Sequence, residues 1–149
     1  MIKISKYLDA NLVIFPEAES RDDALRAMIN TLHQNNKIAD PESFYEAIID
    51  RERIVSTGIG MGVAIPHAKL PSYDEFFIAI AILQKGIGWN ALDGAPVRVI
   101  FMIGGPDDKQ TEYLQILSRL TFALKDEERR KKLLTLNSPP AIIDLLKAF

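Results

Sequence analysis

The stretch FFIAIAIL, residues 76–83, determines which fold class this chain can adopt. None of its eight residues is polar, whereas a strand with one solvated face alternates apolar and polar side chains. The run is also far shorter than the ~20 apolar residues that a membrane-spanning helix needs. We therefore expect a β-strand that is covered on both of its faces.

A second apolar run follows after a glycine-rich turn. The turn reads KGIGWNALDG at residues 85–94, and the run reads VRVIFMI at residues 97–103, interrupted only by Arg98. Gly104, Gly105 and Pro106 end the run, since this cluster does not favour a continuing strand. The sequence thus predicts two buried strands close together in the chain, and a short strand at residues 13–15 is a further candidate.

Two amphipathic helices are predicted before these strands. Ser20 fits an N-cap, with Asp23 three residues later and apolar residues at helical spacing after it: Leu25, Met28 and Leu32. Asp40 fits a second N-cap with Pro41 in the first helical position. This second helix is expected to end near residues 51–53. Its expected buried positions are Phe44, Ala47 and Ile48, with Ile49 as an open case.

Three more helices are predicted after the strands. Asp107 or Asp108 is expected to cap a helix that runs to about Leu124, with its leucines at positions 114, 117 and 120 facing inward. Asp126 and Ser138 mark two further helix starts, and the last helix carries Ile142, Ile143, Leu145 and Leu146. Strands embedded among helices predict a layered α/β fold. Without repeats or a linker, residues 1–149 are expected to form one domain.

Composition excludes several classes of site. The chain has 149 residues and no cysteine, so a disulfide, a thiolate nucleophile and a cysteine-ligated metal are excluded. With two histidines we expect no metal and no cofactor. The net charge of −2 and a single basic cluster at residues 129–132 argue against nucleic-acid binding. The N-terminal sequence lacks a signal peptide, which favours a cytoplasmic location without membrane insertion.

The loop IVSTGIGMGVAIPHAKLP, residues 54–71, is the candidate site. Its three glycines allow backbone N–H groups to approach an anion, and His67 follows directly after Pro66. A neutral imidazole, with an ordinary pKa of about 6.5, can act as a base, a ligand or a nucleophile. A structural loop histidine remains the alternative. A dinucleotide-binding loop is rejected because Val63 stands where the third glycine belongs.

Other residues in or near this loop have two possible roles each. Arg51 can clamp phosphate oxygens, or it is an exposed helix-end arginine that pairs with Glu52 or another acid. Ile59 and Met61 fit a docking surface and the core equally well. His33 lies on the flank of a predicted helix, so a surface position is favoured.

The stretch RERIVSTGIGMGVAIPHAK, residues 51–69, resembles the active-site signature of type-2 enzyme IIA domains. These domains serve the fructose, mannitol and nitrogen-regulatory branches of the bacterial phosphoenolpyruvate-dependent phosphotransferase system. The similarity extends to an early LVI segment, the capped helix at Ser20, WNALDGAPVRVIFMIGGP and YLQILSRL. The resemblance implies an α/β fold with a mixed β-sheet of about five strands between helical layers.

The resemblance also implies a phosphoryl relay. The phosphoryl group would arrive from the phosphohistidine of an HPr-like phosphocarrier protein, rest on His67, and pass to a cysteine of an enzyme IIB. Arg51 matches the arginine of the family signature, and Thr57 matches its hydroxyl, which is expected to donate a hydrogen bond to the phosphoryl group.

One position departs from the family pattern. Tyr113 stands where these domains usually carry a second histidine. A tyrosine hydroxyl donates one hydrogen bond but carries no charge near neutral pH. We therefore expect phosphate acceptance on His67 with slow or lost onward transfer. In the alternative, Tyr113 is simply a packed helix residue and the second histidine is dispensable.

Three functions remain open. A nitrogen-regulatory phosphoprotein, which controls target proteins by its phosphorylation state, is favoured by Tyr113 and by the absence of a fused transporter or IIB domain in these 149 residues. A sugar-specific enzyme IIA that feeds an enzyme IIB is the alternative. A binding module that has lost phosphorylation is the third.

Overall fold

The two apolar runs form the central strands of the sheet. The computed structural model describes residues 2–149. In it β5 (Phe77–Ile87) and β6 (Val97–Gly105) pair antiparallel, with Ile80 opposite Phe101. The side chains of residues 77–83 and 99–103 are buried on both faces, as the lack of polar alternation predicts, whereas Gln84 and Lys85 of β5 are exposed.

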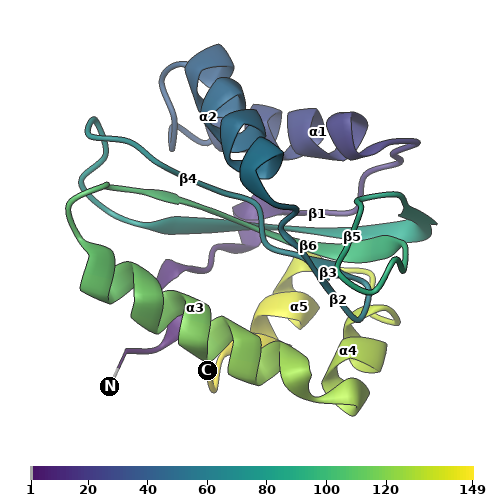
Figure 1. Ribbon diagram of the computed structural model, residues 1–149. Helices are drawn as coiled ribbons and strands as arrows, with labels where there is room; N and C mark the ends of the chain where they lie inside the picture. Colours follow the sequence, from purple (N-terminus) through teal and green to yellow (C-terminus); the bar gives the residue numbers. More distant parts are fainter. Residues whose placement is uncertain (1) are drawn as a thin grey trace.

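Four shorter strands complete a mixed sheet of six strands in residues 2–149, one more than expected (Figure 1). β1 (Val13–Ile14) lies parallel to β5, and β2 (Gly58–Gly60) lies antiparallel to β3 (Val63–Ala64). Both β3 and β4 (His67–Lys69) lie parallel to β6. Residues 54–71, which lack helical periodicity and were expected to be irregular or to contain a short extended piece, thus contribute three short strands.

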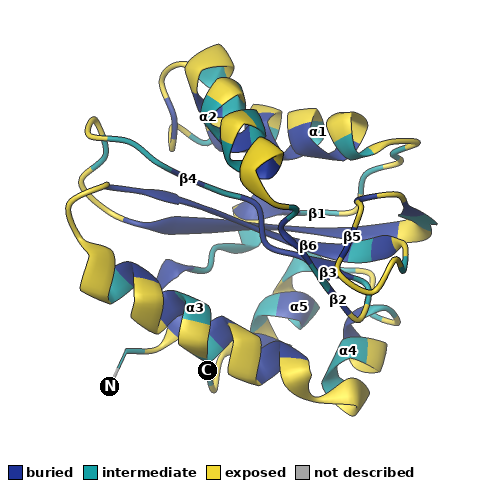
Figure 2. Ribbon diagram, in the orientation of Figure 1, coloured by how far each residue is buried: buried dark blue, intermediate teal, exposed yellow. Residues whose placement is uncertain are grey.

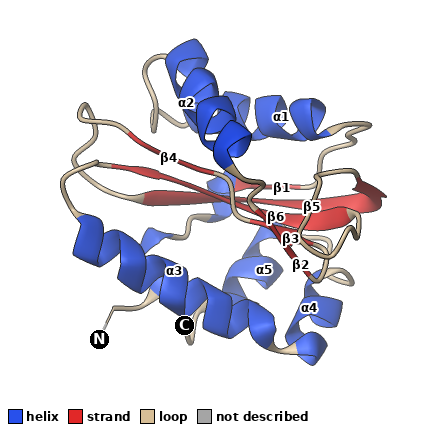
Figure 3. Cartoon of the chain, in the orientation of Figure 1, coloured by secondary structure: helices blue, strands red, loops and turns tan. Residues whose placement is uncertain are grey.

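Helices cover both faces of this sheet (Figures 1 and 3). The helices α1 (Arg21–Gln34) and α2 (Pro41–Ile54) lie on one face. The helices on the other face are α3 (Gln110–Lys125), α4 (Glu127–Leu133) and α5 (Pro139–Leu146). Two 3₁₀ helices, Ile4–Tyr7 and Ala10–Leu12, precede β1. The predicted layered α/β fold is confirmed.

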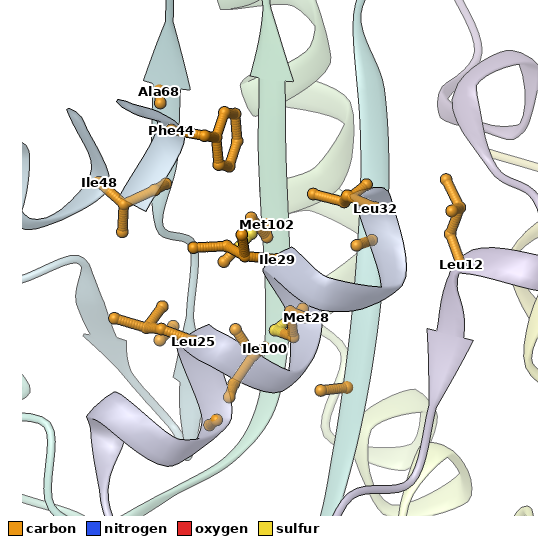
Figure 4. Packing of buried hydrophobic residues seen from close by; sticks show 14 of the residues in the cluster. Leu12, Leu25, Met28, Ile29, Leu32, Phe44, Ile48, Ala68, Ile100 and Met102 are labelled. Carbon is orange, nitrogen blue, oxygen red and sulfur yellow. The ribbon is translucent and has the colours of Figure 1, made fainter. Parts of the chain in front are cut away.

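The sheet separates two apolar clusters (Figure 2). On β5, Ala79 and Ala81 belong to the cluster under α1 and α2, whereas Ile78 and Ile80 belong to the cluster under α3 and α5. Figure 4 shows the first cluster, in which side chains of α1 pack onto Ile100 and Met102 of β6. Small residues on one face and large ones on the other therefore explain the alternation IAIAI from Ile78 to Ile82.

Local capping signals placed most helix starts correctly. Ser20 accepts a hydrogen bond from the backbone N–H of Asp23, and Asp40 accepts one from Ser43. Asp126 and Ser138 cap α4 and α5 in the same way. Each of these side chains satisfies a backbone donor that has no partner within the helix, which is why the signal is readable from sequence.

The prediction for α3 was wrong in its start and in part of its inward face, since Leu120 is buried as expected but Leu114 is not. The helix begins at Gln110 after Lys109, and neither Asp107 nor Asp108 caps it. Its buried residues are Tyr113, Ile116, Leu120, Ala123 and Leu124, whereas Leu114 is 53% exposed and Leu117 is only partly buried. Tyr113 and Phe76 pack together in the apolar cluster, so Tyr113 belongs to the buried face of the helix.

The buried face of α2 also differs from expectation. Phe44 and Ile48 are buried, but Ala47 and Ile49 are only partly buried, and Glu52 is buried in the last turn.

In residues 2–149 no helix has the length and apolar character that crossing a bilayer requires.

Candidate functional site

His67 opens β4 and is fixed by its backbone and by its ring. The N–H of Ile103 on β6 donates to the carbonyl of Pro66 at 3.0 Å, which holds the chain directly before the histidine. The ring is half-buried, and its Nδ1 lies 3.1 Å from the carbonyl oxygen of Ile65. This geometry assigns the proton of the neutral ring to Nδ1, which leaves the lone pair on Nε2.

The surroundings of His67 favour its neutral form. Burial lowers the pKa of His67 below its ordinary value, and the charges of Arg51 and Lys69 lower it further. The hydrogen bond to Ile65 and the charge of Glu52 act in the opposite direction but are weaker than the burial. A ring with a lowered pKa is neutral at pH 7, so its Nε2 is a nucleophile.

Arg51 faces this nucleophilic nitrogen. Its Nε donates to Nε2 of His67 at 3.1 Å, and its Nη1 donates to the carbonyl of Val55 at 2.9 Å. Among residues 2–149 it forms no ion pair with a carboxylate. The alternative in which Arg51 pairs with Glu52 is therefore wrong, and a guanidinium stands where a phosphoryl group on Nε2 would lie.

Glu52, next to Arg51, organises the opposite side of the loop and was missed from the sequence. Its carboxylate accepts hydrogen bonds from the backbone N–H and the hydroxyl of Thr57, and one from Nε1 of Trp89 at 3.3 Å. Nη1 of Arg21 lies 3.8 Å from Oε2 of Glu52 and forms an ion pair with it. Glu52 is 6% exposed, so these donors replace the water that the buried charge has lost. A helix-end acid followed by a Ser-Thr pair was its only sequence signal.

The hydroxyl proton of Thr57 is therefore bound to Glu52, in place of the expected hydrogen bond to a phosphoryl group. Thr57 acts on His67 through the backbone instead. Its carbonyl accepts from the N–H of Ile65 at 3.0 Å, and the carbonyl of Ile65 holds Nδ1 of His67. A chain of contacts thus runs from Glu52 through Thr57 and Ile65 to the imidazole.

The glycine turn between β2 and β3 binds an anion that belongs to the chain itself. Gly60, Met61 and Gly62 all have positive φ, at 97°, 61° and 76°. The N–H of Met61 donates to Asp93 at 3.0 Å, and this bond, with one from Ala95, lowers the pKa of Asp93. The expectation that this turn offers its N–H groups to a phosphoryl group is thus corrected for Met61.

Ile59 and Met61, which fitted two roles equally, are now distinguished. Ile59 is partly buried and packs against the apolar cluster of residues under α3 and α5. Met61 is 45% exposed. His33 is exposed, as expected for the flank of a helix.

Tyr113 reaches His67 from the other helical layer. The centroids of the two rings lie 5.4 Å apart with an interplanar angle of 47°, and Phe76 also stacks on Tyr113. Tyr113 is 5% exposed, and burial raises its pKa to about 12, so the phenol is neutral at pH 7. The structure thus brings His67, Arg51 and Tyr113 together at strand β4, while Thr57 contacts His67 only indirectly, through the backbone of Ile65.

The described residues 2–149 hold no group of three His, Asp or Glu side chains placed to bind a metal ion.

Comparisons with known proteins agree with this geometry. The family model described as "Phosphoenolpyruvate-dependent sugar phosphotransferase system, EIIA 2" matches residues 6–149. The fructose-specific EIIABC component of Bacillus subtilis is 38% identical over 130 residues, which are 87% of this chain. The chain spans about a fifth of that relative's length, 20%. The fructose-specific EIIA component of Haloferax volcanii is 32% identical over 127 residues, 85% of this chain and 82% of the relative.

A solved structure shares the whole fold. The nitrogen regulatory protein IIA-Ntr from Neisseria meningitidis superposes with a TM-score of 0.90 at 26% identity. The superposition covers 96% of this chain and 98% of that one. Proteins with sugar-specific and with nitrogen-regulatory names are thus both similar to the chain.

Proposed function

We propose a function from one established premise: the chain belongs to the EIIA 2 family of the phosphoenolpyruvate-dependent sugar phosphotransferase system. Our proposal is that the chain is a phosphocarrier that accepts a phosphoryl group on Nε2 of His67 from an HPr-like phosphocarrier protein. The 3.1 Å contact between Nε of Arg51 and this nitrogen carries the proposal. This contact places the guanidinium of Arg51, a group that binds phosphate, beside Nε2 of His67. The other ring nitrogen, Nδ1, is already bound to the carbonyl of Ile65.

The transfer needs no base from the protein. The lone pair of Nε2 attacks phosphorus, the P–N bond of the donor phosphohistidine breaks, and the donor ring leaves as neutral imidazole with the electron pair. The proton stays on Nδ1 of His67, where the carbonyl of Ile65 stabilises the positive charge that the ring acquires. The neutral tautomer of His67 is therefore already the reactive one.

Arg51 exchanges partners during this step. In the structure its Nε–H points at Nε2 of His67, where the P–N bond would form. As phosphorus approaches, this donor is placed to bind the phosphoryl oxygens, over which charge is spread in the transition state. Removing one preorganised donor of this kind typically costs ~10²–10³ in rate.

Within the family we favour the nitrogen-regulatory type, in which the phosphorylation state controls target proteins. The TM-score of 0.90 with IIA-Ntr and the neutral Tyr113 support this choice. A phosphoryl group adds about two negative charges. It would add them next to Arg51, which also binds the carbonyl of the half-exposed Val55, so the surface that a target protein meets there would change from cationic to anionic.

The alternative is a sugar-specific enzyme IIA that passes the phosphoryl group to an enzyme IIB. The 38% identity with a fructose-specific component favours it. The two types differ in onward transfer to a cysteine of an enzyme IIB, which only the sugar-specific type requires.

The experiment is an incubation of the purified chain with enzyme I, HPr and phosphoenolpyruvate, followed by intact mass spectrometry. We expect a gain of one phosphoryl group that is acid-labile and absent in His67→Ala and in His67→Gln. Addition of an enzyme IIB then separates the two types. No gain in the wild-type chain, with enzyme I and HPr shown to be active, would identify a binding module and end the proposal.

A further inference from the structure

A second cation lies close to the acceptor histidine, on its own strand. We propose that Lys69 is a phosphoryl-binding residue, whose ammonium group moves from Gln110 to the phosphoryl group on His67. This inference rests on the proposed function, since it needs a phosphoryl group on that histidine.

The strand β4 places the two side chains on one side of the sheet. His67 and Lys69 lie opposite Ile103 and Gly105 of β6. The residue between them, Ala68, is buried in the cluster under α1 and α2. Because side chains alternate along a strand, His67 and Lys69 point toward α3, with Cα atoms roughly 6–7 Å apart. The flexible four-carbon stem of lysine spans such a separation.

Tyr113 of α3 connects the two residues. The Nζ of Lys69 lies 4.1 Å from the centroid of the Tyr113 ring, and the centroid of the His67 ring lies 5.4 Å from it. An ammonium group is attracted to the face of an aromatic ring. The ring is 5% exposed and stacked on Phe76, so it offers a fixed surface next to the imidazole.

The present partner of Lys69 is weak compared with a phosphoryl group. Its Nζ donates to the neutral amide oxygen of Gln110 at 2.8 Å, and both side chains reach solvent. Within the described part of the chain Lys69 forms no ion pair, whereas Lys85 and Lys147 bind carboxylates. The amide of Gln110 is neutral, whereas a phosphoryl oxygen carries negative charge, so the attraction between opposite charges favours the phosphoryl oxygen as the partner of Lys69.

A further cation would add to the positive charge that faces the phosphoryl group. A phosphoryl group carries about two negative charges, and Arg51 supplies one positive charge at Nε2. Tyr113 is neutral at pH 7 and supplies none. The charge of Lys69 already reaches the acceptor ring, because it contributes to the lowered pKa of His67.

The test uses phosphoramidate as the phosphoryl donor, so that no docking protein is involved. Its P–N bond breaks, ammonia leaves with the electron pair, and the Nε2–P bond forms. All variants carry His33→Gln, which removes the exposed second histidine. The comparison is between Lys69→Gln, Lys69→Arg and the matched control Lys85→Gln. The measurements are the initial rate of phosphorylation and the ³¹P NMR titration of phosphorylated His67.

We expect Lys69→Gln to slow phosphorylation about tenfold or more, and to raise the pH at which the phosphoryl group takes up its proton, because a neighbouring cation is lost. Lys69→Arg should retain most of the rate, and Lys85→Gln should match the parent. A residue that only supported the fold would leave the ³¹P titration unchanged.

Gln110→Ala tests the movement itself. Removing the amide should leave the rate unchanged or raise it, since the ammonium is then free to reach the phosphoryl group. A rate that falls as far as in Lys69→Gln would contradict the exchange of partners.

A Lys69→Gln variant with the parent's rate and the parent's ³¹P titration overturns the inference and leaves the proposed function intact. A parent chain that gains no phosphoryl group from phosphoramidate or from phosphorylated HPr overturns both.

Discussion

The two sides of His67 are built in different ways. On the α2 side, Arg51 contacts Nε2, while Glu52 and Thr57 fix the loop through a buried charge and directional hydrogen bonds. On the α3 side, Tyr113 offers a neutral ring, and the nearest cation is held by a neutral amide. The α2 side fixes the position of the nucleophilic ring. On the α3 side, Lys69 is bound only by a neutral amide, so its ammonium group can move to the phosphoryl group.

The largest expected effect comes from removing the cation on the α2 side. Arg51→Met should slow phosphorylation from HPr by ~10²–10³, because a preorganised donor to the phosphoryl oxygens is lost. It should also raise the pKa of His67, which the charge of Arg51 lowers. Rapid-quench kinetics and an NMR titration of the ring measure the two effects. Arg53→Met, two residues along α2 and paired only with exposed Asp50 in residues 2–149, is the control. Equal rates for both variants would contradict the role of Arg51.

The second-largest effect is expected from replacing Glu52, the buried acid on the α2 side. Glu52→Gln places an amide N–H₂ group among the donors of Thr57 and Trp89, so one of these donors loses its acceptor. We expect the free energy of unfolding to fall by about 1–3 kcal/mol. Urea denaturation measures it, and Glu46→Gln on the exposed face of the same helix serves as the matched control. Unchanged stability in Glu52→Gln would show that the network is not needed.

A substitution of Tyr113 on the α3 side should change the rate of onward transfer to an enzyme IIB. Tyr113→His introduces a group that can carry a charge, and charged hydrogen bonds exceed neutral ones by about 1 kcal/mol. We expect transfer to an enzyme IIB to rise about five- to tenfold, while acceptance from HPr changes little. Tyr113→Phe keeps the ring, removes the hydroxyl, and should match the wild type. If Tyr113→His leaves onward transfer unchanged, the tyrosine is only a packing residue.

The smallest effect is the pH dependence of acceptance. The pKa of His67 is lowered in the folded chain, mainly by burial, so the ring stays neutral to a lower pH than a free histidine. Acceptance should therefore be flat from pH 8 to about 6.5 and decrease only below that value. The same shift means that the folded state loses stability as the pH falls from about 6.5 toward the lowered pKa, because the unfolded chain binds the proton more readily. A rate that already falls above pH 6.5 would contradict the lowered pKa.

Features set by near neighbours in the chain were readable from sequence. Caps such as Ser20 and Asp40 satisfy backbone donors three residues away, and the run FFIAIAIL reports its own burial. The closeness of Arg51 and His67 followed from the family signature, which lies within residues 51–69. Caps and the burial of a strand depend on local geometry, which the sequence encodes directly, whereas the pairing of Arg51 with His67 was suggested only by the resemblance.

Features that depend on rotation and on distant partners were misjudged or missed. The buried face of α3 includes Tyr113, which packs on Phe76, and the expectation for Leu114 failed although the helix itself was correct. The hydroxyl of Thr57 was expected at the phosphoryl group, but Glu52 holds its proton. The spacing of apolar residues predicts a helix, but it does not fix the rotation of that helix about its axis. The predicted buried face can therefore be displaced by one residue.

The layered fold, the helix starts with side-chain caps and the segment that holds His67 could all be predicted from the order of the residues, because periodicity and capping act over a few residues. The directions of the charged side chains depend on contacts between elements: Arg51 toward the imidazole, Glu52 toward Thr57, and Lys69 across the ring of Tyr113. A side chain several bonds long has many directions open to it, and its partners on other elements select one.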